Sequence, residues 1–339
     1  MRRGQFGGVG TLALAGLLGG LMLGCGEGNT EREDTPSDPA AVGAADLPEG
    51  AQAISFLGEP LYPPEASEEA SAGQNRQLEE ALADLERDPD GADALIWVGR
   101  RYAYLGEYRQ AIQIFSLGAE FHPGDARFYR HRGHRYITVR ELDKAIADFR
   151  KAVELVEGLP DEIEPDGQPN SMGIPTSTLQ FNIWYHLGLA HYLKGELEAA
   201  AEAYGRCMEV SAHPDSKVAT AHWWYMTLRR LGRTEEAGEL LGRLDLDALG
   251  PEVIESGSYL SLLRLYASPP DKWQEALSQL DPATLEGATY GYGVGNFHFY
   301  NGRVDQAREI FERIVGARDQ WASFGYIAAE ADLARMAGG

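Results

Sequence analysis

Two blocks of the chain share one pattern of apolar, small and polar positions, and the second block lies thirty-four residues after the first. Apolar positions recur every three or four residues, the spacing that covers one face of a helix. The pattern breaks near 105–107 and again near 139–141. Each block is therefore predicted to be a helix, a short turn and a second helix. The recurring positions are Gly99 and Gly133, Tyr102 and Tyr136, Ala111 and Ala145, and Phe115 and Phe149.

A period of thirty-four residues with these small and aromatic positions resembles the tetratricopeptide repeat. The resemblance implies an all-α fold, a right-handed α-solenoid of helix-turn-helix repeats with capping helices. Two antiparallel helices approach closely only where Gly or Ala brings their backbones together, and an aromatic ring fills the space beside that point. One helix pair cannot bury its apolar face alone, so neighbouring repeats are expected to share a core.

The same pattern returns along the rest of the chain and weakens after the fourth repeat. A closing helix over 321–336 is expected to cover the exposed end of the stack, because its apolar residues lie three or four apart. The segments assigned on this pattern are an N-terminal capping helix (74–91), repeats 1 and 2 (92–158), repeats 3 and 4 (178–248), a degenerate repeat (252–282), a last repeat (287–318) and a C-terminal capping helix (319–339).

An insertion at 159–177 separates the second repeat from the third. It contains four prolines and the acidic run 161–166. It is too rich in proline to be a helix and is longer than ordinary connections between helices. Insertions in solenoids often carry function on one face of the array. A functional element and a simple spacer both fit this composition.

The first twenty-four residues have the pattern of an export signal, with Arg2 and Arg3 followed by an apolar run over 9–23. Gly24 before Cys25 resembles the bacterial lipoprotein signal, in which the thiol is lipidated and the cysteine becomes the N-terminus. The resemblance implies a membrane anchor at Cys25. Because Gly26 is not the Asp that commonly signals inner-membrane retention, the periplasmic face of the outer membrane is the expected location. A secreted protein and an inner-membrane anchor are the alternatives.

The stretch 25–73 consists mostly of Gly, Glu, Asp, Pro, Ser and Ala, which cannot bury enough apolar surface to order itself. It is predicted to be a flexible acidic tether. One patch differs, because 54–62 carries several large apolar residues. We expect this patch to be a strand or extended piece that docks on the solenoid, with a free peptide motif as the alternative.

Charge excludes one class of partner. The chain has 30 basic and 52 acidic residues, a net charge of −22, and loss of 1–24 with its two arginines leaves 28 against 52, or −24. No excess of Lys and Arg exists to displace counterions, so nucleic acid is not expected as a partner. Cys207, the second of two cysteines, falls at a small-residue position of its repeat and is predicted to be a buried structural thiol.

No sequence pattern of an enzyme is present: GxSxG, phosphate-loop, HExxH and paired CxxC motifs are all missing. His131 and His134 lie three residues apart, but the arginines between and around them oppose a bound cation. The chain is therefore predicted to be neither an enzyme nor a metal or cofactor protein.

The resemblance to tetratricopeptide repeats also implies which side chains line a concave groove. Five of them are arginines, an uneven distribution in so acidic a chain, and guanidinium groups bind carboxylates or phosphates in forked pairs. The alternative is that these arginines pair with the acidic insertion, which would then act as a built-in competitor. The predicted groove residues are Arg100, Tyr104, Arg127, Arg130, His134, Tyr185, Tyr192, His222, Arg229 and Arg230.

These observations predict a lipid-anchored scaffold that binds a protein or an acidic peptide segment in a partly basic groove, in envelope assembly. A solute- or glycan-binding lipoprotein is the alternative, since the Tyr and Trp content permits it. An enzyme with its site at the insertion is a third reading, for which the sequence offers no catalytic residues.

Overall fold

The computed structural model describes residues 47–338 apart from 65–66, 270–271 and 273–283. The chain divides into two compact units, 1–38 and 39–339, and every described residue lies in the second. The predicted signal segment, Cys25, the predicted tether up to residue 46 and the end of the predicted degenerate repeat lie outside the described residues. Among the helices described, none is long and apolar enough to cross a membrane.

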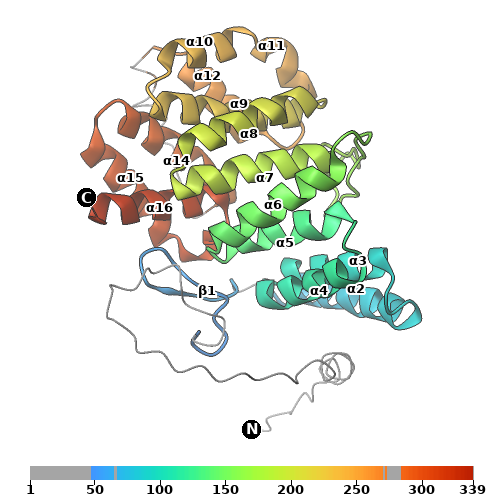
Figure 1. Ribbon diagram of the computed structural model, residues 1–339. Coiled ribbons are helices and arrows are strands. Elements are labelled where there is room, and N and C mark those ends of the chain that lie inside the picture. Colours follow the sequence, from blue (N-terminus) through green and yellow to red (C-terminus); the bar gives the residue numbers. More distant parts are fainter. Residues whose placement is uncertain (1–46, 65–66, 270–271, 273–283, 339) are drawn as a thin grey trace, which may run out of the picture. The chain divides into compact units, whose positions relative to one another are not determined.

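Helices make up most of the described part, and they pair in chain order across short turns (Figure 1). This confirms the predicted all-α helical-repeat fold. The helices are α2 (Glu68–Arg87), α3 (Ala92–Tyr104), α4 (Tyr108–Phe121), α5 (Ala126–Thr138), α6 (Leu142–Val156), α7 (Leu179–Lys194), α8 (Leu197–Val210), α9 (Pro214–Arg230), α10 (Thr234–Gly242), α11 (Leu246–Leu249), α12 (Gly257–Tyr266), α14 (Leu285–Tyr300), α15 (Val304–Gly316) and α16 (Phe324–Gly338), with short 3-10 helices η3 (Gly250–Glu252) and η4 (Arg318–Gln320).

The recurring glycines are the points where the two helices of a repeat touch. A Cβ at Gly99 would lie 2.4 Å from the Phe115 ring. One at Gly133 would lie 2.9 Å from the ring of Phe149. A larger residue would push the pair apart, which is why glycine and an aromatic ring recur together. The relation repeats as Gly188 with Tyr204 and Gly295 with Phe311.

Part of the predicted tether is folded. Strands β1 (Ala53–Ile54) and β2 (Pro60–Leu61) form an antiparallel hairpin, as expected for a docked patch. Ala53 and Leu61 are buried. Arg109 donates from Nε to the Gln52 carbonyl at 2.7 Å, and Trp321 donates from Nε1 to the Tyr62 carbonyl at 2.6 Å.

The predicted tether boundary at 73 therefore differs from the structure, where α2 already begins at Glu68. Ser67 accepts a hydrogen bond from the Ala70 N–H and so caps the helix. Composition underestimated the order of this segment because backbone hydrogen bonds and a few buried residues, Leu61 among them, hold the hairpin.

The C-terminal helix does more than cover the end of the stack. α16 packs on α14 and α15, and it also contacts α7 in the third repeat. Glu330 on α16 pairs with Arg140 in the turn between α5 and α6, at 2.7 Å between Oε2 and Nη2. Both side chains are almost fully buried, at 1% and 3% exposure. The same carboxylate accepts the Phe56 N–H at 2.6 Å, so one buried acid joins the hairpin, the second repeat and α16.

Arg140 takes an unusual backbone conformation to reach this site. Its φ is 68°. The equivalent turn position of the preceding repeat is Gly106, which has a φ of 80°. Residues other than glycine rarely adopt this left-handed backbone conformation, so the contacts of Arg140 must outweigh a strain of about 1 kcal/mol. The guanidinium also donates to the Thr138 and Trp321 carbonyls, at 2.5 and 2.9 Å.

Candidate functional site

Three adjoining cavities lie along α3, α5, α7 and the start of α9, on the side where the insertion folds over them. The first, of about 130 Å³, and the second, of about 180 Å³, are both lined by Arg100, Arg130 and Glu164. The second and the third, of about 220 Å³, share Thr176 and Ser177 of the insertion and Glu255. Because each cavity shares lining residues with the next, we treat them as one groove.

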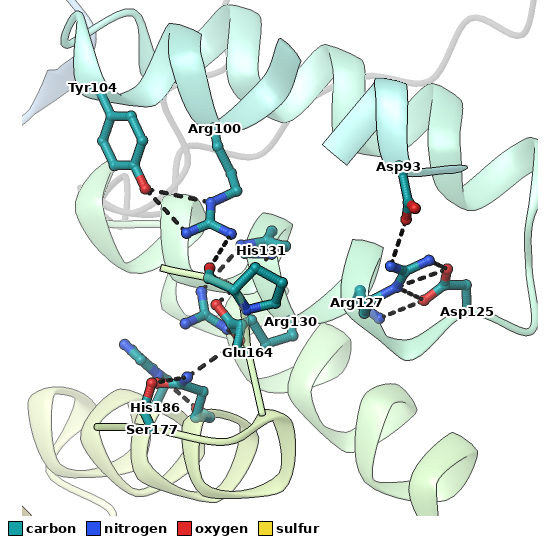
Figure 2. Close-up of polar contacts among 12 residues, drawn as sticks. Asp93, Arg100, Tyr104, Asp125, Arg127, Arg130, His131, Glu164, Ser177 and His186 are labelled. Atoms are coloured by element: carbon teal, nitrogen blue, oxygen red, sulfur yellow. Dashed lines mark hydrogen bonds and ion pairs between the residues drawn. The ribbon is translucent and has the colours of Figure 1, made fainter. Parts of the chain in front are cut away.

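The insertion occupies this groove with an acidic, extended segment. Glu164 forms an ion pair with Arg130 at 2.8 Å between Oε2 and Nε, and both side chains are about nine-tenths buried. Asn182 on α7 donates to the same carboxylate oxygen at 3.2 Å. Figure 2 shows Glu164 beside Arg130 of α5, while Arg100 of α3 contacts the neighbouring Pro165 carbonyl.

Arginines also bind the backbone of the insertion. Arg100 donates from Nη1 to the Pro165 carbonyl at 2.7 Å, and Arg101 donates to the Gly167 carbonyl at 3.1 Å. A Cβ at Gly167 would lie 2.1 Å from the Tyr104 hydroxyl. A side chain at this position would displace Tyr104 or Arg100, so the glycine lets the segment lie closely against α3.

The two ends of the insertion are tied together by main-chain contacts. The Leu179 N–H donates to the Glu162 carbonyl at 2.8 Å, and the Glu164 N–H donates to the Ser177 carbonyl at 3.3 Å. Its apolar side chains point outward, with exposures of 58%, 67%, 62% and 41% for Leu159, Ile163, Met172 and Ile174. Polar contacts, rather than apolar burial, hold the insertion in the groove.

The first cavity has a positive field. Arg100, Arg130 and Arg135 line it together with a single carboxylate, Glu164. Burial, together with the charges of Arg130 and Arg100, lowers the pKa of Arg135 to about 10. Burial and the same arginines hold the pKa of His131 well below its usual range, so this imidazole is neutral near pH 7.

His134, predicted to line the groove, lines the first cavity and packs against other rings. Its centroid lies 4.4 Å from that of His186 and 5.4 Å from that of Phe324 on α16. Burial and Arg135 keep its pKa well below the usual range. In the described part of the chain, no group of three or more His, Cys, Asp or Glu side chains is arranged to hold a metal ion.

Arg127 points away from the groove, although it was predicted to line it. It pairs with Asp125 at 2.6 Å and with Asp93 at 2.7 Å, as Figure 2 shows at the far side from Glu164. These hydrogen bonds raise its pKa, against the opposing effect of burial. Arg127 therefore lies on the rim, and Arg130, about one helical turn later on α5, lies in the groove.

A second set of predicted groove residues is covered by the chain's own C-terminal part. Arg230 donates from Nη1 to Oδ1 of Asp332 on α16 at 2.8 Å, and its Nη2 bonds the other carboxylate oxygen. Tyr192 bonds Tyr292, which donates to the same aspartate at 2.9 Å. The Arg230 side chain is 6% exposed and that of Asp332 is 1% exposed.

Other predicted residues near α9 also contact neighbours within the chain. His222 is fully buried against Tyr259 and Tyr266, and burial lowers its pKa to about 3. Arg229 stacks over the Tyr300 ring at 4.4 Å from its centroid. Tyr185 differs from these, because it is buried yet lines the third cavity.

Sequence reasoning missed several residues of the groove. Arg135 does not fall at a groove position of the repeat, and only its place in an arginine-rich helix hinted at a role. Asp215 and Glu255 line the third cavity. Asp215 binds the backbone N–H groups of residues 254–256, at 2.6–2.9 Å, so it orders the segment that carries Glu255.

Comparison with known proteins supports the repeat type. Residues 181–214, which cover most of α7 and all of α8, match the family model described as Tetratricopeptide repeat. Among curated proteins, the chain is similar to Protein bimA of Emericella nidulans, at 22% identity over 114 residues, or 34% of this chain. The match covers only 12% of bimA.

Solved structures with a similar arrangement share little sequence. MamA is 19% identical, with 48% of this chain and 81% of MamA covered at a TM-score of 0.38. YrrB, a tetratricopeptide-repeat protein with an unusual peptide-binding site, is 15% identical, with 72% and 96% covered at a TM-score of 0.40. The helix pairs themselves and the match at 181–214 define the class: an all-α protein of helix-turn-helix repeats, one of which matches the tetratricopeptide repeat.

Proposed function

We propose that this chain is a non-enzymatic scaffold that binds an extended, acidic segment of a protein partner in the groove beneath the insertion. One observation carries the proposal: the groove already holds such a segment from its own chain. Arg130 binds a carboxylate there, while Arg100 and Arg101 bind backbone carbonyls. Side-chain recognition combined with backbone recognition is how a groove holds a peptide rather than a free ion.

We also propose that Cys25 carries a lipid anchor and that the scaffold works at the periplasmic face of the outer membrane, in envelope assembly. The export-signal pattern of 1–24 ending at Gly24–Cys25 supports this proposal. Cell fractionation tests it: the Cys25→Ala protein should leave the membrane fraction. Retention of that variant in membranes would exclude the anchor.

Affinity capture from solubilised envelopes tests the groove. The chain lacking 1–24 is used as bait, and bound proteins are identified by mass spectrometry. Arg130→Glu should lose the specific partner, because it places a negative charge where the partner's carboxylate binds. Arg206→Glu is the matched control, since Arg206 is 58% exposed on α8, outside the groove, and contacts Glu209 and the Trp184 ring. Equal recovery with Arg130→Glu and wild type would rule out this groove.

The third cavity favours a second candidate, a glycan-binding protein. Tyr185 and Phe181 supply rings, while Asn182, Ser177 and Asp215 supply polar groups, which is the mixture that sugars require. Binding to a glycan array, lost in Tyr185→Ala and unaffected by Arg130→Glu, together with no captured protein, would favour this candidate over the scaffold.

A further inference from the structure

The first cavity carries more positive charge than its own chain balances. Arg135 lies on α5 beside Arg130, and its guanidinium lies over the Tyr108 ring at 5.5 Å from the centroid. Within the described residues no carboxylate forms an ion pair with it. The lining of the cavity thus has three guanidinium groups and one carboxylate, that of Glu164. Arg135 is half-buried. A charge that is partly removed from water without an opposite charge is unfavourable, so the site favours a second anion.

We propose that this cavity is a carboxylate subsite, and that the partner's segment enters the groove by exchange with the insertion. One carboxylate of the partner takes the place of Glu164 on Arg130, and a second is bound by Arg135 and Arg100. The inference rests on the proposed function and names the partner's chemistry: an extended peptide with at least two acidic side chains.

The contacts of the insertion suit exchange. Glu164 meets Arg130 through a single ion pair, and its neighbours in the insertion expose their apolar side chains. Undocking the insertion therefore exposes little apolar surface to water, and such exposure is the main cost of undocking a segment. The insertion has the advantage of a high effective concentration, and a second carboxylate gives the partner a contact that the insertion does not make.

The backbone contacts decide between a peptide and a free anion. Arg100 and Arg101 bind the carbonyls of Pro165 and Gly167, which a phosphate ion does not provide. Free phosphate is therefore expected to compete weakly, and its strong binding is an outcome that the experiment includes.

The test uses the chain lacking 1–24 and a labelled synthetic peptide that copies residues 160–168, read by fluorescence anisotropy. Glu164→Gln in the protein should bind this peptide at least tenfold more tightly than wild type, because the competitor loses its charge. Gly167→Ala should act in the same direction without changing charge, since its methyl group would clash with Tyr104. Glu162→Gln, at an exposed acid of the same insertion, should match wild type.

Arg135 is tested in the Glu164→Gln background. The probe here is a labelled polyglutamate peptide of the same length, because the docked 160–168 segment places Glu164 on Arg130 and no carboxylate on Arg135, whereas polyglutamate has further carboxylates that can reach it. Arg135→Gln should weaken polyglutamate binding at least tenfold, whereas Arg127→Gln, at the ion-paired rim position, should leave it within twofold. Inorganic phosphate at 10 mM should not displace the peptide. Unchanged affinity in Glu164→Gln and Gly167→Ala, unchanged affinity in Arg135→Gln, or full displacement by phosphate would each overturn the inference.

Hydrogen exchange on the wild-type protein provides a test without substitutions. Saturating peptide should accelerate exchange of the Leu179 and Glu164 amides, which donate to the Glu162 and Ser177 carbonyls while the insertion is docked. Peptide binding with no change at these amides would exclude exchange. Capture of an envelope partner that depends on Arg130 but not on Arg135 or Glu164 would leave the proposed function standing and overturn this inference.

Discussion

Two buried arginine–carboxylate pairs use the same chemistry with different consequences. Arg230 and Asp332 bond through both oxygens, and Tyr292 and Arg335 satisfy the same carboxylate. Arg130 and Glu164 meet at a single point beside two cavities. The first acid comes from a buried helix and the second from an exposed loop. One pair is suited to permanent closure and the other to exchange.

The largest expected effect comes from breaking the Arg230–Asp332 pair. Asp332→Ala should lower the free energy of unfolding by about 3–5 kcal/mol, because Arg230 would remain buried without its counter-charge. Urea denaturation followed by circular dichroism measures this. Glu209→Ala, which removes the exposed partner of Arg206, is the control and should leave the urea midpoint unchanged. A cost below about 1 kcal/mol for Asp332→Ala would contradict the permanent role.

Glu164→Gln should cost less, about 1–2 kcal/mol in the same measurement. Arg130 loses a charge-assisted contact, but the adjoining cavities admit water that can solvate it. If Glu164→Gln destabilises the protein as much as Asp332→Ala does, the insertion is a fixed part of the fold and the contrast between the two pairs disappears.

Acid should act on the two regions in different pH ranges. Burial and Arg130 hold the pKa of His186, which lies beside the groove of the Arg130–Glu164 pair, well below its usual range. An unfolded histidine binds a proton near pH ~6.5 while the folded one does not, so its stabilising contribution is complete above that pH and is lost below it. Burial alone would raise the pKa of Asp332, but Arg230 and Arg335 outweigh it and lower the pKa. Its contribution therefore lasts down to about pH 4.

Urea unfolding at a series of pH values between 7.5 and 4.5 checks this order. Each buried neutral histidine adds a slope of at most about 1.4 kcal/mol per pH unit below pH ~6.5. His186→Phe should remove one such contribution, since a phenyl ring can still stack on Phe149 and meet Phe324 edge to face. An unchanged slope in His186→Phe would show that this imidazole is not held neutral.

The smallest effect should come from the outer side of the insertion. Ile163→Ser and Met172→Ser should change the free energy of unfolding by less than about 0.5 kcal/mol, because both side chains are more than 60% exposed. Differential scanning calorimetry measures the shift. A larger loss would indicate that these apolar side chains hold the insertion, which would weaken the case for exchange.

The repeats could be predicted from the chain itself, and the contents of the groove could not. Gly99 and Phe115 lie sixteen residues apart, and each repeat restates their relation, so the pattern was visible. Arg100, Arg130 and Arg127 were all predicted to share the groove, yet only the first two do. Successive side chains on a helix point about 100° apart. Where the spacing of a repeat is imperfect, the sequence does not determine which of these side chains face the groove.

The sequence alone determined what is local and periodic: helix pairs, turns, the glycine contacts and an insertion rich in acid and proline. Tertiary structure decided which charges meet. Glu330 pairs with Arg140 across 190 positions and Asp332 with Arg230 across 102, while the insertion rather than a distant segment supplies Glu164. Periodicity specifies contacts between neighbours, because neighbouring helices must share a core. It does not specify which of many exposed acids folds back onto which arginine, since that depends on the summed geometry of every repeat between them.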